Sequence, residues 1–156
     1  MTNQELLESF YAAFARRDGD TMAAAYAPGA TFSDPVFPGL TGDQPGAMWR
    51  MLTSRSTDLA LELVSCQADG ATGSARWIAT YTFTQTGNTV VNDVTSRFRF
   101  ADGLIIDQVD TFDFHRWAGQ ALGTQGKLLG WTPFLRKAVQ GKARAGLDAF
   151  MAADKS

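Results

Sequence analysis

The chain has 156 residues, of which 45% are hydrophobic and 19% are charged, as is typical of one globular domain with a packed core. Its formal net charge of -2 would not attract phosphates, so we expect neither nucleic acid nor an acidic membrane as a partner. No apolar run reaches the roughly 20 residues of a membrane span, and the residues around Leu6 do not resemble a signal peptide, so we expect a cytoplasmic protein.

Two helices are expected at the beginning of the chain. A capping-box pattern at Thr2 and helically spaced apolar residues predict an amphipathic helix over residues 3–16. Asp18 is a candidate N-cap for a second helix, with Tyr26 on its buried side and Pro28 at its end.

A short β-rich piece over residues 31–37 and a third helix over residues 43–53 precede a change in period. Residues 58–116 then alternate between apolar and polar side chains, and Asp-Gly or Gly-Asn dipeptides interrupt them at hairpin spacing. This pattern predicts a four-stranded antiparallel meander. Helices followed by a run of strands favour an α+β fold, built here as a single domain.

The last part of the chain is expected to be helical. Thr132-Pro133 is a typical helix start and predicts a helix to about Ala152, with Phe134 and Leu135 in its apolar stripe. The three glycines in residues 118–129 leave that segment unassigned. Trp131 and Phe134 would either close a pocket or contact a neighbouring subunit.

Alternation divides the strand side chains between two faces of the sheet. The face covered by the helices is expected to carry Trp77, Tyr81, Ser96, Phe98, Gln108, Asp110 and Phe112. The outer face would carry Ile78, Thr80, Thr82, Val109 and Thr111 among Arg97, Arg99 and Asp107, and we expect a homodimer to pack there. His115 has the opposite parity to Asp110, so we expect it to point away from the covered face.

Three short motifs carry a resemblance to a known superfamily. They are Ala30-Thr31-Phe32-Ser33-Asp34-Pro35-Val36, Arg97-Phe98-Arg99-Phe100 and Asp110-Thr111-Phe112-Asp113. In their order and spacing they resemble the nuclear transport factor two-like superfamily, in its ketosteroid isomerase and SnoaL-like polyketide cyclase branches. The resemblance implies a cone-shaped, curved antiparallel sheet packed on the N-terminal helices, with a core over about residues 5–115 and a helical extension over about residues 116–153.

Compared residue by residue, the isomerase pattern is only partly present. Asp34 matches the general base, but the oxyanion-hole tyrosine falls on Phe10 and the protonated aspartic acid on Ser96. Loss of one such donor raises a barrier by about 2.7 to 4 kcal/mol, which argues against a true steroid isomerase. An epoxide hydrolase pattern would place an arginine and an aspartate where Val94 and Ser96 stand, and Asp110 alone matches.

The resemblance implies an apolar pocket for a small hydrophobic ligand and no cofactor. Our leading hypothesis is an isomerase, cyclase or lyase that acts on a small carbonyl compound, with Asp34 as the base and Asp110 as the partner acid. Burial would raise the pKa of at least one of these carboxyl groups. The expected lining consists of Phe10, Phe14, Trp49, Trp77, Tyr81, Ser96, Phe98, Gln108 and Phe112.

Other interpretations stay open at this point. Asp34, which precedes Pro35, could simply be a turn residue. Asp110 could be a carboxylate bonded to backbone amides at a strand end, and the aromatic residues could simply form the core. A binding module for an apolar metabolite and a protein-interaction domain are the alternatives to an enzyme. The sequence has no cluster of His and Cys residues, so we expect no metal site. Cys66, the single cysteine, is expected to be an inert packed thiol.

Overall fold

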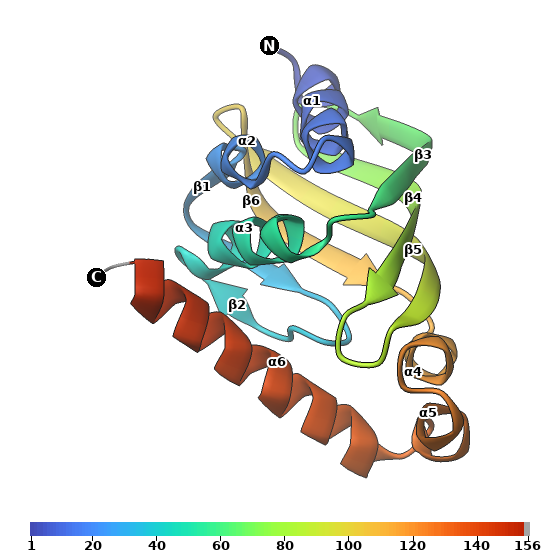
Figure 1. The fold of residues 1–156 in the computed structure, drawn as a ribbon. Helices are drawn as coiled ribbons and strands as arrows, with labels where there is room; N and C mark the ends of the chain where they lie inside the picture. The colour runs from blue at the N-terminus through green and yellow to red at the C-terminus, as the bar shows by residue number, and fades with distance from the viewer. Residues whose placement is uncertain (155–156) are drawn as a thin grey trace.

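The computed structural model describes residues 1–154, and it shows helices on one face of a curved sheet with further helices at the end of the chain (Figure 1). The helices are α1 (Asn3–Ala15), α2 (Gly19–Ala24), α3 (Gln44–Arg55), α4 (Phe114–Leu122), α5 (Thr124–Leu129) and α6 (Pro133–Asp154). The strands are β1 (Tyr26–Ser33), β2 (Leu40–Thr41), β3 (Ala60–Ala68), β4 (Thr72–Phe83), β5 (Asn88–Ala101) and β6 (Leu104–Thr111). The α+β prediction is confirmed.

The six strands form one sheet in the order β2-β1-β6-β5-β4-β3. Strands β3 to β6 pair antiparallel in sequence order, so the predicted four-stranded meander is confirmed. Strand β1 pairs with β6 in parallel and with β2 in the antiparallel sense. The sheet is therefore mixed, and its first strand comes from the N-terminal part of the chain.

Helix α1 begins as its sequence predicts. The Thr2 hydroxyl accepts from the Glu5 amide at 3.1 Å, while the Glu5 carboxylate accepts from the Thr2 amide at 2.9 Å, which completes a capping box. The helix then buries Leu7, Phe10 and Phe14 against the sheet, together with Tyr11.

Three predicted boundaries are wrong. The β-rich piece expected over residues 31–37 is the end of β1, which stops at Ser33 because Asp34 accepts from the amides of Val36 and Phe37 and turns the chain. The second helix ends at Ala24, and Tyr26 and Pro28 belong to β1, because the register with β6 shifts between Tyr26 and Thr31 and this irregularity accommodates a proline that cannot donate to a ladder. The last strand of the meander ends at Thr111 rather than near residue 116. Its extension stops there because Asp113 becomes the N-cap of α4 and accepts from the Arg116 amide at 3.1 Å.

The C-terminal part of the chain contains the predicted helix and two further helices that the sequence pattern did not predict. Helix α6 begins at Pro133 and ends at Asp154, close to the expected bounds, whereas α4 and α5 fill the unassigned segment. Phe134 does not join the apolar stripe and is 79% exposed, because Leu135, one position further along the helix, turns toward the protein instead. Trp131 is 72% exposed, so neither aromatic side chain closes a pocket. Among the described residues, no helix is long and apolar enough to span a membrane.

The core consists of two neighbouring apolar clusters. The larger cluster fills the space between the sheet and α1 to α3, and the smaller one joins α4 to the ends of β4 and β5. Val36, Tyr81 and Phe112 contact both clusters. These three partly buried side chains therefore mark the boundary between the cone and the tail.

Candidate active site

Asp34 lies just after β1, in a turn that its own side chain stabilises. Its Oδ1 accepts from the amides of Val36 at 2.7 Å and Phe37 at 2.6 Å, which is the pattern of a turn-forming aspartate. The carboxyl group is half-buried, and its second oxygen makes no hydrogen bond with the described residues. Asp34 is therefore a turn residue, and its Oδ2 is left without a hydrogen-bond partner among the described residues.

Burial raises the pKa of Asp34 to about 6, although three interactions oppose this effect. The amides of Phe37 and Val36 lower the pKa, and so does the positive charge of Arg136 on α6. Helix α6 also holds the turn directly, because the Gln140 amide donates to the Pro35 carbonyl at 3.0 Å. The C-terminal helix thus contacts the turn that holds Asp34 and contributes to lowering the pKa of its carboxyl group.

Asp110 lies on β6 and is only 3% exposed, deep under the helices. Its Oδ1 accepts from the Gln108 amide at 2.9 Å, and Ser96 stands opposite it on β5. Burial raises the pKa of Asp110 to about 7, Ser96 and Gln108 lower it, and the charge of Asp34 raises it further. Of these effects on the pKa of Asp110, that of the Asp34 charge is the smallest.

The polar side chains around Asp110 extend into a chain of hydrogen bonds. The Tyr26 hydroxyl donates to Gln108 Oε1, and the Trp49 indole donates to the Tyr26 hydroxyl at 2.7 Å. On the other side, the Trp77 indole donates to Ser96 Oγ at 2.8 Å. These bonds orient Gln108 and Ser96 toward Asp110, so the carboxyl group lies in an ordered polar environment inside an apolar core.

Tyr11 departs from this pattern. It is 2% exposed, and within the described residues its hydroxyl is the buried side-chain polar atom that has no hydrogen-bond partner. Burial raises the pKa of Tyr11 well above its usual value, and the charge of Asp110 raises it further. The neighbouring Ser96 side chain lowers it by a weak polar interaction that does not reach the geometry of a hydrogen bond. A buried hydroxyl without a partner costs about 1 to 3 kcal/mol, so this group stands out as a donor for a ligand oxygen.

Sequence reasoning missed Tyr11 because the comparison with the isomerase motif directed attention to Phe10. Phe10 and Tyr11 are both buried and their rings pack edge to face at 5.2 Å, so the helix presents two adjacent positions to the cone. The available signal was its place four residues after Leu7, on the buried side of the helix.

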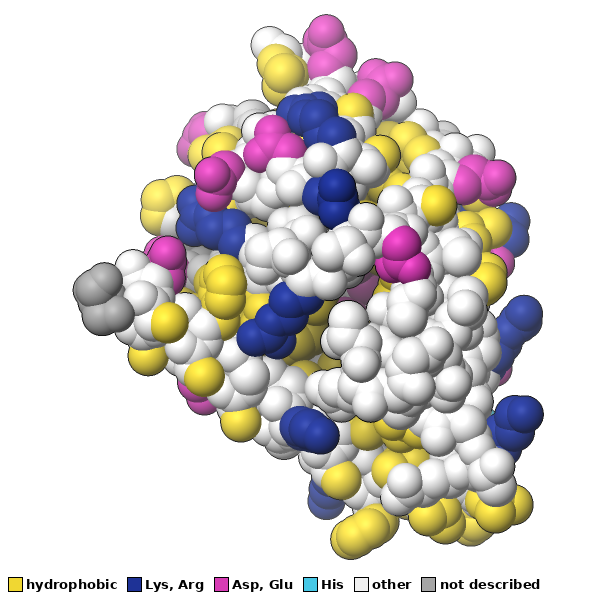
Figure 2. Space-filling model, viewed as in Figure 1, with side chains coloured by type: hydrophobic (Ala, Val, Ile, Leu, Met, Phe, Trp, Pro, Cys, Tyr) yellow, Lys and Arg dark blue, Asp and Glu magenta, His cyan; other side chains and the backbone are white. Residues whose placement is uncertain are grey.

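The aromatic residues that were expected to line a pocket pack mainly against one another. Phe14 lies 5.0 Å from Trp49 and 5.2 Å from Trp77 between ring centroids, and Phe10 lies 6.4 Å from Phe98. Figure 2 shows a hollow between α3, α6 and the β4–β5 turn, with hydrophobic side chains and a recessed acidic side chain inside it. Tyr81 and Phe112 remain partly exposed at the boundary between the two clusters, and the Trp117 indole donates to the Tyr81 hydroxyl at 2.9 Å.

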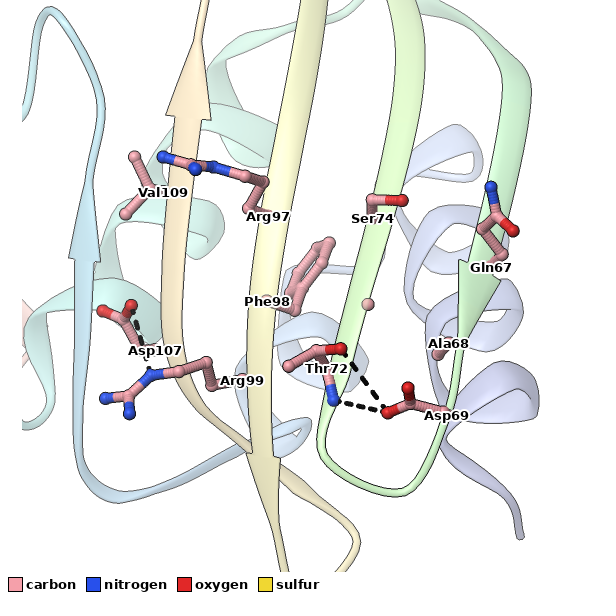
Figure 3. Close-up of a pocket in the computed structure, with 11 residues that line it drawn as sticks. Gln67, Ala68, Asp69, Thr72, Ser74, Arg97, Phe98, Arg99, Asp107 and Val109 are labelled. Carbon is pink, nitrogen blue, oxygen red and sulfur yellow. Dashed lines mark hydrogen bonds and ion pairs between the residues drawn. The ribbon is translucent and has the colours of Figure 1, made fainter.

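A separate groove of about 720 Å³ crosses the face of the sheet turned away from the helices (Figure 3). Arg97 extends over Val109 there, and Arg99 lies 3.9 Å from Asp107. Phe98 also contributes to its lining, but Asp34 and Asp110 do not. This is the outer face on which we expect a homodimer to pack, and that expectation stays a prediction.

His115 lies outside the site. It occupies α4, is exposed, and its Nε2 pairs with the Lys127 carbonyl at 2.9 Å. Among the described residues, no group of three or more His, Cys, Asp or Glu side chains is placed to hold a metal ion. Cys66 is partly buried, and burial raises the pKa of its thiol.

Comparison with known proteins agrees with this architecture. A model of the SnoaL-like domain family matches residues 7–108. The chain belongs to the SnoaL-like domain family. Its match runs from α1 to the middle of β6, so α4, α5 and α6 lie beyond the matched part of the SnoaL-like domain. Curated protein sequences contain no match to the chain.

Solved structures share the fold of this SnoaL-like domain at low sequence identity. An epoxide hydrolase of the limonene epoxide hydrolase-like type from Mycobacterium tuberculosis is 21% identical with a TM-score of 0.63, over 81% of this chain and 92% of that one. A putative polyketide cyclase from Pseudomonas putida is 20% identical with a TM-score of 0.64, over 78% of this chain and 98% of that one. A hypothetical protein with a ketosteroid isomerase-like fold from Catenulispora acidiphila, in complex with trimethylamine, is 14% identical with a TM-score of 0.66, over 83% of this chain and 98% of that one. The predicted superfamily resemblance is confirmed.

Proposed function

We propose that this SnoaL-like domain is a cofactor-independent acid/base enzyme for a small hydrophobic carbonyl compound. The observation that carries the proposal is the pair of carboxyl groups in one apolar cone, whose pKa values burial raises to about 6 for Asp34 and about 7 for Asp110. Near neutral pH, Asp34 is then mainly ionised while Asp110 is protonated in about half of the molecules. Each group thus has the protonation state that its role requires.

Asp34 acts as the base in this mechanism. Its free oxygen removes a proton from the carbon next to the substrate carbonyl, the C–H bond electrons move toward the carbonyl oxygen, and an enolate forms. The amides of Val36 and Phe37 hold the other oxygen, so the carboxylate keeps one orientation during the transfer. A positioned base of matched pKa contributes roughly 100- to 10,000-fold to a rate.

Asp110 and Tyr11 stabilise the enolate oxygen. Protonated Asp110 and the unpartnered Tyr11 hydroxyl each donate a hydrogen bond, and Asp110 can transfer its proton outright. Return of the proton to a different carbon gives an isomer, whereas attack of the enolate carbon on a second carbonyl closes a ring. Because Tyr11 is 2% and Asp110 3% exposed, substrate entry displaces aromatic side chains that cover them.

Deuterium exchange tests the proposal without knowledge of the natural substrate. A panel of apolar monocyclic and bicyclic ketones would be incubated with the protein in D2O, and exchange at the carbons next to the carbonyl would be followed by proton NMR. We expect exchange above the buffer rate for at least one ketone, and its loss in Asp34→Asn.

Asp107→Asn is the matched control, because Asp107 lies on β6 beside the outer groove. Its exchange rate should equal that of the unmodified protein. Ketones that bind, as seen by ligand NMR, without any exchange would overturn the enzyme and favour a binding module.

A further inference from the structure

Four large apolar side chains project into solvent where α5 meets α6. Leu128 is 66% exposed, Leu129 40%, Trp131 72% and Phe134 79%, and we call them the elbow patch. The Trp131 indole donates to the Leu128 carbonyl at 3.0 Å, which fixes the ring within the patch. In Figures 1 and 2 this connection forms a protruding edge of the molecule on which hydrophobic side chains gather. Such a concentration of exposed apolar surface is unusual in a domain that functions alone in water.

The charge around the elbow patch is strongly biased. Residues 114–147 contain six of the 14 basic side chains of the chain and none of its 16 acidic ones. They are Arg116, Lys127, Arg136, Lys137, Lys142 and Arg144. Within the described part of the chain, only Arg144 of these six lies at ion-pair distance from an acid, 3.8 Å from Asp148. The net charge of -2 is therefore the sum of a basic segment over residues 114–147 and a more acidic remainder of the chain.

We propose that the elbow patch docks the protein on a bilayer containing anionic phospholipids. Trp, Phe and Leu side chains enter the interface between headgroups and acyl chains, while neighbouring lysines and arginines pair with the lipid phosphates. The chain supplies both parts at one place, with Lys127 beside Leu128 and Lys137 one helical turn after Phe134. Docking on a bilayer is independent of the chemistry proposed for the cone.

The shape of the patch favours a bilayer over a second copy or an acidic protein. The exposed side chains project from the turn between two helices, so they can enter a fluid interface at the same time without a shaped partner surface. The net charge of -2 by itself predicts no attraction to acidic membranes, but membrane attraction acts over about a Debye length from the contact surface. The local charge of the tail therefore decides the interaction.

Vesicle binding tests this proposal directly. The full chain would be mixed with vesicles of phosphatidylcholine alone or with phosphatidylglycerol at a ratio of about two to one, and bound protein would be measured by sedimentation. We expect binding to the anionic vesicles only, with a blue shift of tryptophan emission, because Trp49, Trp77 and Trp117 are already buried and Trp131 is not. Lys137→Gln and Lys142→Gln should each weaken partitioning roughly fivefold.

The double variant Trp131→Ser with Phe134→Ser should lose binding, whereas Val64→Ser should not. Val64 is a matched control because it is 43% exposed on β3, whose helical neighbour is α1 rather than α5 or α6. The proposal is overturned if the unmodified protein does not sediment with anionic vesicles. It is equally overturned if the double variant binds these vesicles as strongly as the unmodified protein. It is also overturned if light scattering shows a dimer that the double variant abolishes, since a second copy then covers the patch.

Discussion

The Trp77 indole donates to Ser96 Oγ at 2.8 Å, at the position on β5 that pairs with Asp110 on β6. Trp77 comes from β4, so this contact joins three neighbouring strands through the interior of the cone. The hydroxyl of Ser96 in turn lowers the pKa of Asp110. Ser96 thus connects the indole of one neighbouring strand to the acid on the other.

Ser96→Ala should remove both effects. The Trp77 N–H would lose its partner in a buried site, at a cost of about 1 to 3 kcal/mol in the free energy of unfolding. The pKa of Asp110 should rise, because the hydroxyl that lowers it is gone. Urea denaturation measures the first effect and a carboxyl-selective NMR titration the second. Ser96→Thr, which keeps the hydroxyl, should leave the pKa near its original value.

The free energy of unfolding should fall as pH rises from about 5 to about 8. The folded-state pKa values of Asp34 and Asp110 lie above the ordinary value of 3.8, so in this window the folded protein binds more protons than the unfolded chain. The stabilisation is complete below the unfolded value and lost as pH passes the folded values. Denaturation curves at the two pH values measure the difference, and Asp110→Asn should remove most of it. An equal pH dependence in that variant would contradict the assignment.

Tyr11→Phe should separate stability from activity. It deletes a buried hydroxyl that has no partner, so the free energy of unfolding should stay constant or increase by up to about 1 to 3 kcal/mol. Ketone exchange should nevertheless slow, because the enolate oxygen loses a donor. A variant with lower stability would show instead that the hydroxyl is bonded within the protein.

Arg136→Gln should raise the pKa of Asp34, since the charge of Arg136 lowers it. The acidic limb of the pH profile for ketone exchange would then move to higher pH. Lys137→Gln is the control, because it removes the adjacent positive charge on α6 and keeps Arg136, whose charge lowers the pKa of Asp34. A profile that moves equally in both variants would indicate a general effect of net charge.

Gly126→Ala should destabilise the contact between α4 and α5. A Cβ at Gly126 would lie 1.9 Å from the Ala118 carbonyl oxygen, so the two helices would have to separate. We expect a loss of about 1 to 3 kcal/mol in thermal or urea unfolding. Gly141→Ala on α6 meets no atom within 4 Å and should instead stabilise the protein by up to about 1 kcal/mol.

The sequence was informative where one periodic signal dominated. Alternation of side chains and three turn dipeptides were sufficient for the meander, and the capping box for the start of α1. The start of β1 was missed because Pro28 and Gly29 stop a helix and also tolerate an irregular strand. Helices α4 and α5 were missed because close packing of their backbones uses glycines, such as Gly126, which weaken a helical pattern.

The candidate site was predictable to a similar extent. Strand parity correctly assigned Asp110, Gln108 and Ser96 to the covered face, since alternation is a property of the backbone itself. The turn bonds of Asp34 and the isolation of the Tyr11 hydroxyl depend on atoms brought together from distant parts of the chain. Local patterns do not encode such contacts.

The parallel pairing of β1 with β6 has a consequence for how the chain acquires its structure. Residues 26–33 pair with residues 105–109, so nearly the whole meander must exist before β1 can complete its ladder. Long-range pairing of this kind slows folding, because the entropy of closing a large loop is lost before the contacts form. On the ribosome, the first strand would emerge long before the last one, and until β6 is made its buried Phe32 could pack against Trp49 of α3 but not against a completed sheet.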